Sequence, residues 1–412
     1  MPLKTTKKVF TKSMITGWLI FILSYFYFPV PAQESQFDIL TIDQAVDSAL
    51  NNNFRLKNAQ LELEQAELSK KNAIDIPSTE FKYQYGQIFS PINDRYIEIN
   101  QNFGSLLTHI KRYKSAENFI ELNKAQFELT KKEVIAEVKS AYFFWLFQFK
   151  KLEILQEKNE YYSDLTRIAD LNYKLGETDL QEKVTVTALH AQTELDYNTA
   201  QDELTIAQNK LKQLIVVTDD ILPDTIELEL YMIDKPSPST AYNGGPVLNV
   251  YENKIDLERT KYQTEKSKFF PEISVGYFNQ SIGALNGFQG WQARIAFPLW
   301  FFPQSSKIQQ ARINEQMAEN SFENKKFQVE HDVENLLFEL NKYFKQIIYF
   351  KEYALPQAEI LMQSSEMQFK KEELEYKEFL QGISTALNLK LNYYETLNNY
   401  NQTAIQLEFY AN

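Results

Sequence analysis

The side chains that could carry chemistry in this 412-residue sequence are few and scattered. His109, His190 and His331 lie far apart, and none has a second ligand type at the spacing that metal sites use. The sequence has no cysteine, no nucleophile motif, no glycine loop that would cradle a phosphate, and no acid pair in a pocket-forming pattern. We therefore expect no enzyme activity, no metal centre and no cofactor.

A second group of polar side chains alternates with apolar ones, which is the period of a β-strand. Residues 79–87 and 96–103 alternate in this way, and residues 273–277 and 291–297 do so again. We expect strands of about eight to eleven residues, the length that a tilted membrane-spanning strand requires. One face would suit hydrocarbon and the other water, although a half-buried soluble sheet is the alternative for either hairpin alone. The polar face would line a barrel lumen with Lys82, Gln84, Glu98, Asn100, Gln292 and Arg294.

Long helical segments flank these strands. We expect one helix over residues 41–76, with Thr41 as its cap. Between Pro91 and Pro223 there is no proline, so residues 111–175 can form a single helix of about 100 Å at 1.5 Å per residue. Gly176 then breaks the helix, and a second helical stretch runs to residue 214. No compact globular core needs a helix of this length.

The whole pattern occurs twice in the sequence. Pro271 follows Pro77 by 194 positions (271 − 77), and Phe297 follows Phe103 by the same interval. Each half therefore reads as a helix, a β-hairpin and a long helix pair, which indicates a duplicated architecture. We expect the first repeat at residues 33–218, an inter-repeat linker or equatorial segment at 219–246, and the second repeat at 247–412.

The first 32 residues have the pattern of a removable signal peptide. Four lysines lie between positions 4 and 12, an apolar run follows over residues 14–28, and small residues before Gln33 favour cleavage after Ala32. The apolar run is shorter than the roughly 20 residues that a membrane span needs, although an uncleaved anchor is the alternative. In both cases we expect the rest of the chain to leave the cytoplasm.

The charge balance bears on the partners of the protein. The formal net charge is −12, and removal of the lysines in the signal peptide makes the remainder more negative. This balance argues against nucleic acid as a partner, because phosphate binding needs a clustered basic surface. Since cysteine is absent, the exported chain holds together without disulfides and is not lipidated on a cysteine thiol.

Four strands are too few to close a barrel within one chain. In lipid, an open sheet edge leaves backbone groups without partners, at a cost of several kcal/mol each. Two copies would supply eight strands with a side-chain-filled interior, whereas three would supply twelve and leave a water-filled bore. We therefore expect a homotrimer. Trp300, Phe301 and Phe302 follow the last strand, either as an aromatic belt at the membrane interface or as a plug that packs the helices.

Together these features resemble the TolC-like outer-membrane efflux protein family over residues 38–410. The stretches that carry the resemblance are residues 40–45 (LTIDQA), 173–177 (YKLGE), 393–397 (YYETL) and 400–402 (YNQ). The resemblance implies a mostly α-helical fold with membrane β-strands, in which a trimeric twelve-stranded β-barrel is continuous with a periplasmic α-helical barrel. It also implies a passive conduit in the outer membrane, in contact with outer-membrane lipid, that exports small molecules or ions received from an inner-membrane pump and a periplasmic adaptor.

The same resemblance implies roles for residues near the helix-to-helix turns. In the family, acidic residues beyond the tip of the second helix pair narrow the tunnel, and only one of the two usual acids is present here. Glu378 also has a simpler interpretation as one charge on a solvated helix face, and Gly176 as part of a tight turn. The candidate tunnel gate is Glu378, Gln381 and Glu182, and the candidate adaptor-contact tip is Leu175, Gly176, Glu177, Glu372 and Glu373.

A periplasmic adaptor, or a structural coiled-coil protein of an export complex, is the alternative function. Adaptors also carry long helical hairpins, but they usually carry one per chain, flanked by lipoyl-like and small β-barrel modules. Two hairpins that each follow a similar helix fit a channel better. The sequence does not indicate which substrate would be exported or which type of pump would be the partner.

Overall fold

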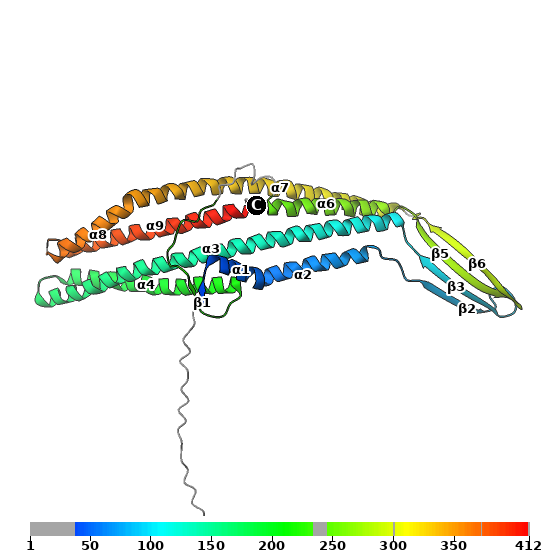
Figure 1. The fold of residues 1–412 in the computed structure, drawn as a ribbon, viewed down its shortest axis with the longest axis horizontal. Helices are drawn as coiled ribbons and strands as arrows, with labels where there is room; N and C mark the ends of the chain where they lie inside the picture. The colour runs from blue at the N-terminus through cyan, green and yellow to red at the C-terminus, as the bar shows by residue number, and fades with distance from the viewer. Residues whose placement is uncertain (1–37, 234–244, 300, 372, 411–412) are drawn as a thin grey trace, which may run out of the picture.

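The structure, a computed structural model, describes residues 38–233, 245–299, 301–371 and 373–410, and it forms a long rod (Figure 1). A small sheet lies at one end of the rod and two helix-to-helix turns lie at the other. The expected signal peptide, part of the linker, Trp300 and Glu372 lie outside the described residues.

Helix α3 (Leu106–Leu175) is the longest element, with 70 residues, or about 105 Å at 1.5 Å per residue. Neither proline nor glycine interrupts it, so its hydrogen-bond ladder is continuous. It ends at Gly176, which adopts a left-handed conformation with φ of 78°, and the Glu177 N–H donates back to the Asn172 carbonyl at 2.9 Å. Helix α4 (Leu180–Ile215) then returns along α3 from the cap Asp179. The predicted break at Gly176 is confirmed, and the helix begins five residues earlier than expected.

The second half repeats this layout with a defect in its long helix. Helix α6 (Pro246–Ser267) leads to the sheet, and α7 (Phe301–Tyr349), a π-helical turn (Phe350–Ala354) and α8 (Leu355–Lys370) lead away from it. Together the last three cover residues 301–370, which is the same length as α3. The wide turn ends two residues before Pro356, which has no backbone N–H to donate. Helix α9 (Tyr376–Tyr410) returns along α8 and α7 and also packs on α3.

The single helix predicted over residues 41–76 is wrong. The segment forms α1 (Ile42–Asn52), α2 (Phe54–Ser69) and a short 3₁₀ turn (Lys70–Ala73), although Thr41 does cap α1 as expected. Asn53 separates the two helices with an extended backbone. Its side chain accepts from the Arg55 N–H at 2.9 Å and donates to the Leu214 carbonyl at 2.9 Å. At the break, the Asn53 side chain therefore supplies a hydrogen-bond donor for a carbonyl in the last turn of α4. The local sequence does not reveal this contact.

The four-stranded sheet joins the two hairpins side by side. Strands β2 (Glu80–Gly86), β3 (Asp94–Asn102), β5 (Glu272–Ile282) and β6 (Leu285–Ala296) are antiparallel in the order β2-β3-β5-β6. The two halves meet through β3 and β5, which leaves β2 and β6 as the edges of the sheet. A separate parallel pair, β1 (Asp38–Leu40) and β4 (Ile221–Pro223), lies near the middle of the rod.

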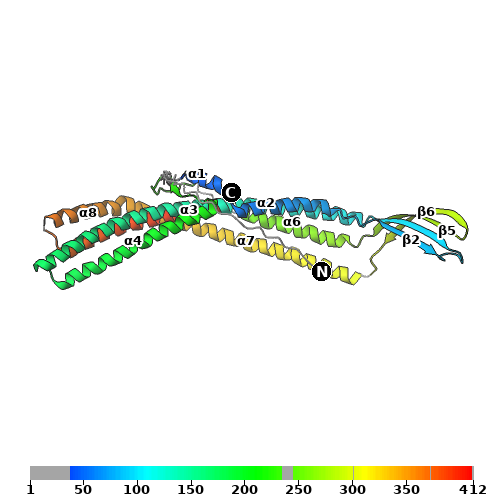
Figure 2. The same ribbon diagram turned by 90° about the horizontal axis from the view of Figure 1, so that it is seen from below.

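Apolar packing is concentrated in two clusters along the helices. The larger lies around mid-length, where Trp145 of α3, Leu211 of α4 and Leu397 of α9 are almost fully buried. There the Tyr142 hydroxyl donates to Asp224 at 2.7 Å and so ties the segment after β4 to α3. Figure 2 shows that α1 lies on one side of the long helices at this level. A smaller cluster stabilises the end opposite the sheet.

Among the described residues, no helix combines the length and the apolar character that crossing a membrane would require.

The Asn53 linkage gives a stability prediction. We expect Asn53→Ala to lower the free energy of unfolding by about 1–3 kcal/mol, because it removes the cap of α2 and leaves the Leu214 carbonyl without its donor. Thermal unfolding followed by circular dichroism measures the effect. Asn51→Ala is the matched control, since Asn51 is exposed and bonds only within α1. Equal unfolding temperatures for the two variants would contradict this account of the helix break.

Candidate functional site

The six polar residues expected to line a lumen share one face of the sheet. In the strand register, Lys82 of β2 lies opposite Glu98 of β3. Gly276 of β5 lies between Asn100 of β3 and Gln292 of β6. Because alternate residues of a strand point to the same side, Gln84 and Arg294 lie on this face too. The pairing therefore gathers side chains from both halves of the chain onto one surface.

Glu98 is the centre of the interactions on this face. The residue is 7% exposed, and its carboxylate accepts hydrogen bonds from the Gln292 amide at 2.6 Å, from the Tyr96 hydroxyl at 3.0 Å and from the Arg294 guanidinium. A buried carboxylate needs such partners, because an unpaired one would be strongly destabilising. Glu98 thus joins the first hairpin to the second through a hydrogen bond with Gln292 and an ion pair with Arg294.

The opposite face of the sheet is apolar and exposed. Phe81, Tyr83 and Tyr85 of β2 lie on it, as do Trp291 and Ile295 of β6. Trp291 is 77% exposed and Phe81 67% exposed. Contiguous apolar surface of this extent in a single chain indicates a surface that another apolar phase covers.

The two aromatic residues that begin α7 differ in their surroundings. The Phe301 ring lies 5.9 Å from the ring of Phe269, which precedes β5, so it packs against the sheet-side end of α6. The Phe302 side chain is 84% exposed at the start of α7. One of the two therefore contacts a neighbouring helix end, and the other projects outward.

The candidate tip residues lie at the end of the rod farthest from the sheet (Figure 1). Leu175, Gly176 and Glu177 form the turn between α3 and α4, and the Leu175 side chain is 63% exposed. Glu373 lies in the turn between α8 and α9, where its N–H donates to the Gln368 carbonyl at 3.0 Å. The two turns come from different halves of the sequence and reach the same end of the molecule.

Two of the candidate gate residues begin helices at this end. Glu182 and Glu378 lie in the first turns of α4 and α9, where the helix dipole favours a carboxylate. The Glu182 N–H donates to Asp179 at 2.7 Å, and its carboxylate accepts from the Thr178 hydroxyl, so Glu182 also serves the helix cap. The starts of α4 and α9 lie in one apolar cluster through Val186 and Ile383. Burial and then the charge of Glu182 raise the pKa of the Tyr376 phenol there.

Glu378 and Gln381 belong to a polar stripe that runs along α9. Its members recur every three or four residues and are exposed, and they are Glu378, Gln381, Thr385, Asn388 and Asn392. Asn401, nine residues or about two and a half turns beyond Asn392, lies on the other side of the helix. There its side chain bonds both to the Glu229 carbonyl and to the Tyr231 N–H at 2.8 Å. The stripe therefore faces away from the segment that follows β4, and its period could have been found in the sequence.

The residues that hold the helices together near the tip were not predicted from the sequence. Phe369 of α8 stacks on Phe379 of α9 with ring centroids 4.3 Å apart, and the Tyr161 hydroxyl of α3 donates to Glu366 of α8. Gly382 lets α8 and α9 approach so closely that an added Cβ would collide with the Ser365 hydroxyl. A glycine within a helical pattern was the available signal.

The three histidines do not come together. His109 lies in the first turn of α3, and its Nε2 is 2.7 Å from the Phe103 carbonyl. His331 lies in α7, and its Nδ1 is 2.9 Å from the Phe327 carbonyl. His190 lies in α4. In the part of the chain that the structure describes, no group of three or more His, Asp or Glu side chains is arranged to hold a metal ion.

The close approach at Gly382 gives a second prediction. We expect Gly382→Ala to cost about 1–3 kcal/mol of stability through overpacking against Ser365, and to separate α8 from α9 near the tip. Thermal unfolding and limited proteolysis of the turn at residues 371–375 measure the two effects. The double variant with Ser365→Ala should recover part of the loss, because it removes the colliding hydroxyl. No loss in the single variant would refute the tight crossing.

No family model matches the sequence, and no curated protein matches it. Solved structures match it over most of its length. The outer membrane channel CmeC of Campylobacter jejuni superposes with a TM-score of 0.77 at 16% identity, covering 90% of this chain and 85% of that one. The open state of the MtrE outer membrane channel of Neisseria gonorrhoeae gives 0.72 at 14% identity, covering 90% and 88%. The outer membrane protein VceC of Vibrio cholerae gives 0.72 at 12% identity, covering 90% and 94%.

High coverage of both chains means that the similarity concerns the whole arrangement of sheet and helices, and not one helix pair. The expectation of a mostly helical fold with a small set of strands is confirmed in the same comparison. The chain has the TolC-like fold of outer-membrane channels.

Proposed function

We propose that this chain is the outer-membrane channel of a tripartite efflux system. It would act as a passive trimeric conduit that carries small molecules or ions from a pump and an adaptor to the cell exterior. The observation that carries this proposal is the sheet, which has one exposed apolar face, one polar face and two edges without a partner strand among the residues that the structure describes. The likeness to solved outer-membrane channels supports it.

The sheet edges support the trimer. An edge strand in hydrocarbon would leave a row of backbone N–H and C=O groups without partners. Pairing of β2 in one copy with β6 in the next would satisfy both edges, and three copies would close a twelve-stranded barrel. The apolar face would then meet lipid, and Lys82, Gln84, Glu98, Asn100, Gln292 and Arg294 would line the lumen.

The helices would continue this conduit into the periplasm. The polar stripe of α9 faces away from the segment after β4, as the wall of a water-filled tunnel would require. Glu378, with Gln381 and Glu182 near it, would narrow the tunnel at the tip. Leu175, Gly176 and Glu177, together with Glu372 and Glu373, would contact the periplasmic adaptor that joins the channel to its inner-membrane pump. This assigns the sheet to the outer membrane and the helices to the periplasm, with no enzymatic step.

Two measurements on the purified protein test the channel directly. We expect heat-labile trimers in the outer-membrane fraction and stepwise ion conductance in planar bilayers. Deletion of residues 273–297 should abolish the trimer, because it removes most of β5 and β6, while circular dichroism should still report the long helices. A stable trimer in that variant would show that the strands do not join the copies, and fractionation with the inner membrane would favour an adaptor.

The gate assignment has a test of its own. We expect Glu378→Ala to raise single-channel conductance, because it removes the one acid of the stripe at the tunnel end. Glu352→Ala is the control, since it removes an exposed carboxylate from the π-helical turn, away from the tip. Equal conductance for Glu378→Ala and the control would count against the gate and leave the channel itself intact.

A further inference from the structure

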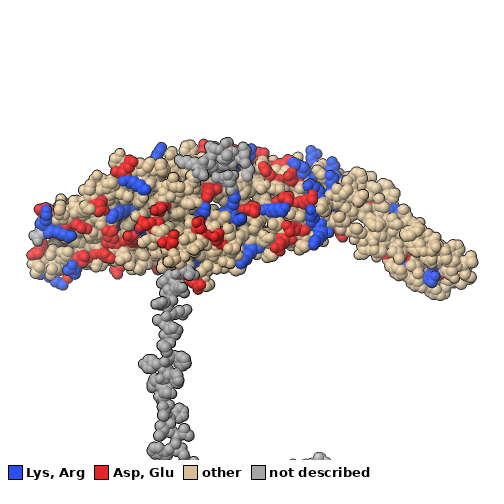
Figure 3. Space-filling view, in the orientation of Figure 1, with Lys and Arg blue, Asp and Glu red and all other residues tan. Residues whose placement is uncertain are grey.

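Basic side chains collect where the helices meet the sheet. Figure 3 shows Lys and Arg gathered across the helices beside the sheet, which itself carries few charges on this side. Four segments adjoin the sheet, residues 70–75, 106–116, 261–270 and 301–312, and they contain two acids, Asp75 and Glu265. Their ten basic residues, here named the basic belt, are Lys70, Lys71, Lys111, Arg112, Lys114, Lys261, Lys266, Lys268, Lys307 and Arg312. The whole chain has a net charge of −12, so this excess is local.

Several of these cations have no protein partner. Lys70 and Lys114 share Glu117, Lys261 pairs with Glu258, and Lys268 pairs with Glu265. Lys111 donates to Gln263 at 3.0 Å. In contrast, the side chains of Lys71, Arg112 and Arg312 make no ion pair or hydrogen bond with the residues that the structure describes, and Lys71 and Arg312 are exposed. Cations without a counter-charge destabilise the folded chain, so these three favour an anionic partner outside the chain.

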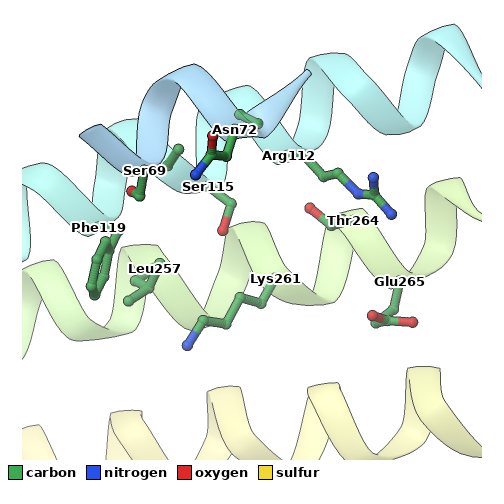
Figure 4. Close-up of a pocket in the computed structure, with 11 residues that line it drawn as sticks. Ser69, Asn72, Arg112, Ser115, Phe119, Leu257, Lys261, Thr264 and Glu265 are labelled. Carbon is green, nitrogen blue, oxygen red and sulfur yellow. The ribbon is translucent and has the colours of Figure 1, made fainter. Parts of the chain in front are cut away.

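Arg112 also borders a hollow between helices. The hollow has a volume of about 380 Å³ and is open to solvent, and α2, α3, the 3₁₀ turn and α6 surround it. In Figure 4, Arg112 and Ser115 extend from α3 toward α6, where Lys261 and Thr264 lie. The Thr264 hydroxyl donates to the Thr260 carbonyl, and the Glu265 carboxylate, which pairs with Lys268, also lines the hollow. The Arg112 guanidinium and the Ser115 hydroxyl are the donors there of the kind that hold a phosphate.

The position of the belt along the rod narrows the choice of anion. The exposed apolar face of the sheet comes first, then exposed apolar residues such as Leu106, Leu299 and Phe302, and then the belt. Arg112 lies six residues into α3, or about 9 Å from its start. The headgroup layer on each side of a bilayer is roughly 5–8 Å thick. If the sheet spans the hydrocarbon, the belt lies at the level of the lipid phosphates on the helix side.

We infer that the basic belt binds the phosphate headgroups of anionic phospholipids in the membrane leaflet that faces the helices. The inference rests on the proposed function, because it needs the sheet to lie in the membrane. Each Lys or Arg near an anionic surface adds to the attraction, so several together form a substantial attachment. The chain has no cysteine to carry a lipid, and the belt would fix its depth in the bilayer instead.

Lipid titration of the full-length protein in neutral detergent tests this inference. The belt variant combines Lys71→Gln, Arg112→Gln, Lys266→Gln and Arg312→Gln, and the control variant combines Lys210→Gln, Lys254→Gln, Lys345→Gln and Lys351→Gln, which removes four exposed charges elsewhere on the helices. We expect the belt variant to bind fluorescent phosphatidylglycerol at least about tenfold more weakly than wild type, with unchanged binding of phosphatidylcholine. The control should bind both lipids as wild type does. Raising the salt from about 0.1 M to about 1 M should weaken wild-type binding, because the screening length falls from ~10 Å to ~3 Å.

Three results would overturn the inference. Equal losses in the belt and control variants would mean that total charge matters and the belt does not. Competition by inorganic phosphate at the affinity of the lipid would indicate a site for soluble anions. Unchanged phosphatidylglycerol binding in the belt variant would exclude the belt outright. Conductance measured on the same preparations separates this outcome from the proposed function, since a conducting protein without lipid preference would remain a channel.

Discussion

The continuous hydrogen-bond ladder of α3 is the feature on which the rest of the structure depends. This helix runs from the sheet to the opposite tip as one unbroken element, and α2, α4, α6 and α9 all pack along it. A proline inside it would remove a backbone bond and cost about 3 kcal/mol or more. Because none occurs, backbone geometry sets the separation between the two ends of the molecule. A globular core is not needed to hold them about 100 Å apart.

Along this axis the surface changes in an order that matches a membrane protein with a large aqueous part. The sheet presents an exposed apolar face with Trp291 and Phe81, and the first turns of the helices present the basic belt. Farther along, α9 presents the polar stripe that begins at Glu378. Each surface suits a different medium: hydrocarbon, phosphate headgroups and water. The proposed channel and the proposed lipid contact both follow from this order.

The regular features of the fold were predictable because they are local. Alternation with period two revealed the strands and put Lys82, Glu98 and Arg294 on one face, which the register bears out. The break at Gly176 followed from the conformational freedom of glycine. The helix break at Asn53 was not predicted, because the Leu214 carbonyl that accepts a hydrogen bond from its side chain lies 161 residues away in the sequence. The roles of Glu378, Gln381 and Glu182 came from a family resemblance, and they remain proposals.

Local patterns in the sequence were enough to predict the long helices, the four strands of the sheet, the duplicated layout and the two-faced character of the strands, since each of these depends on neighbours a few residues apart. Three features could be seen only in the folded chain: which strands meet, how closely α8 approaches α9 at Gly382, and where ten cations from four separate segments gather. The physical reason is that pairing, close packing and surface charge depend on distances between atoms that the chain brings together only when it folds. The spacing of apolar residues along the sequence indicates which side of a helix or strand is apolar. The packing of the folded chain determines which residues that side contacts.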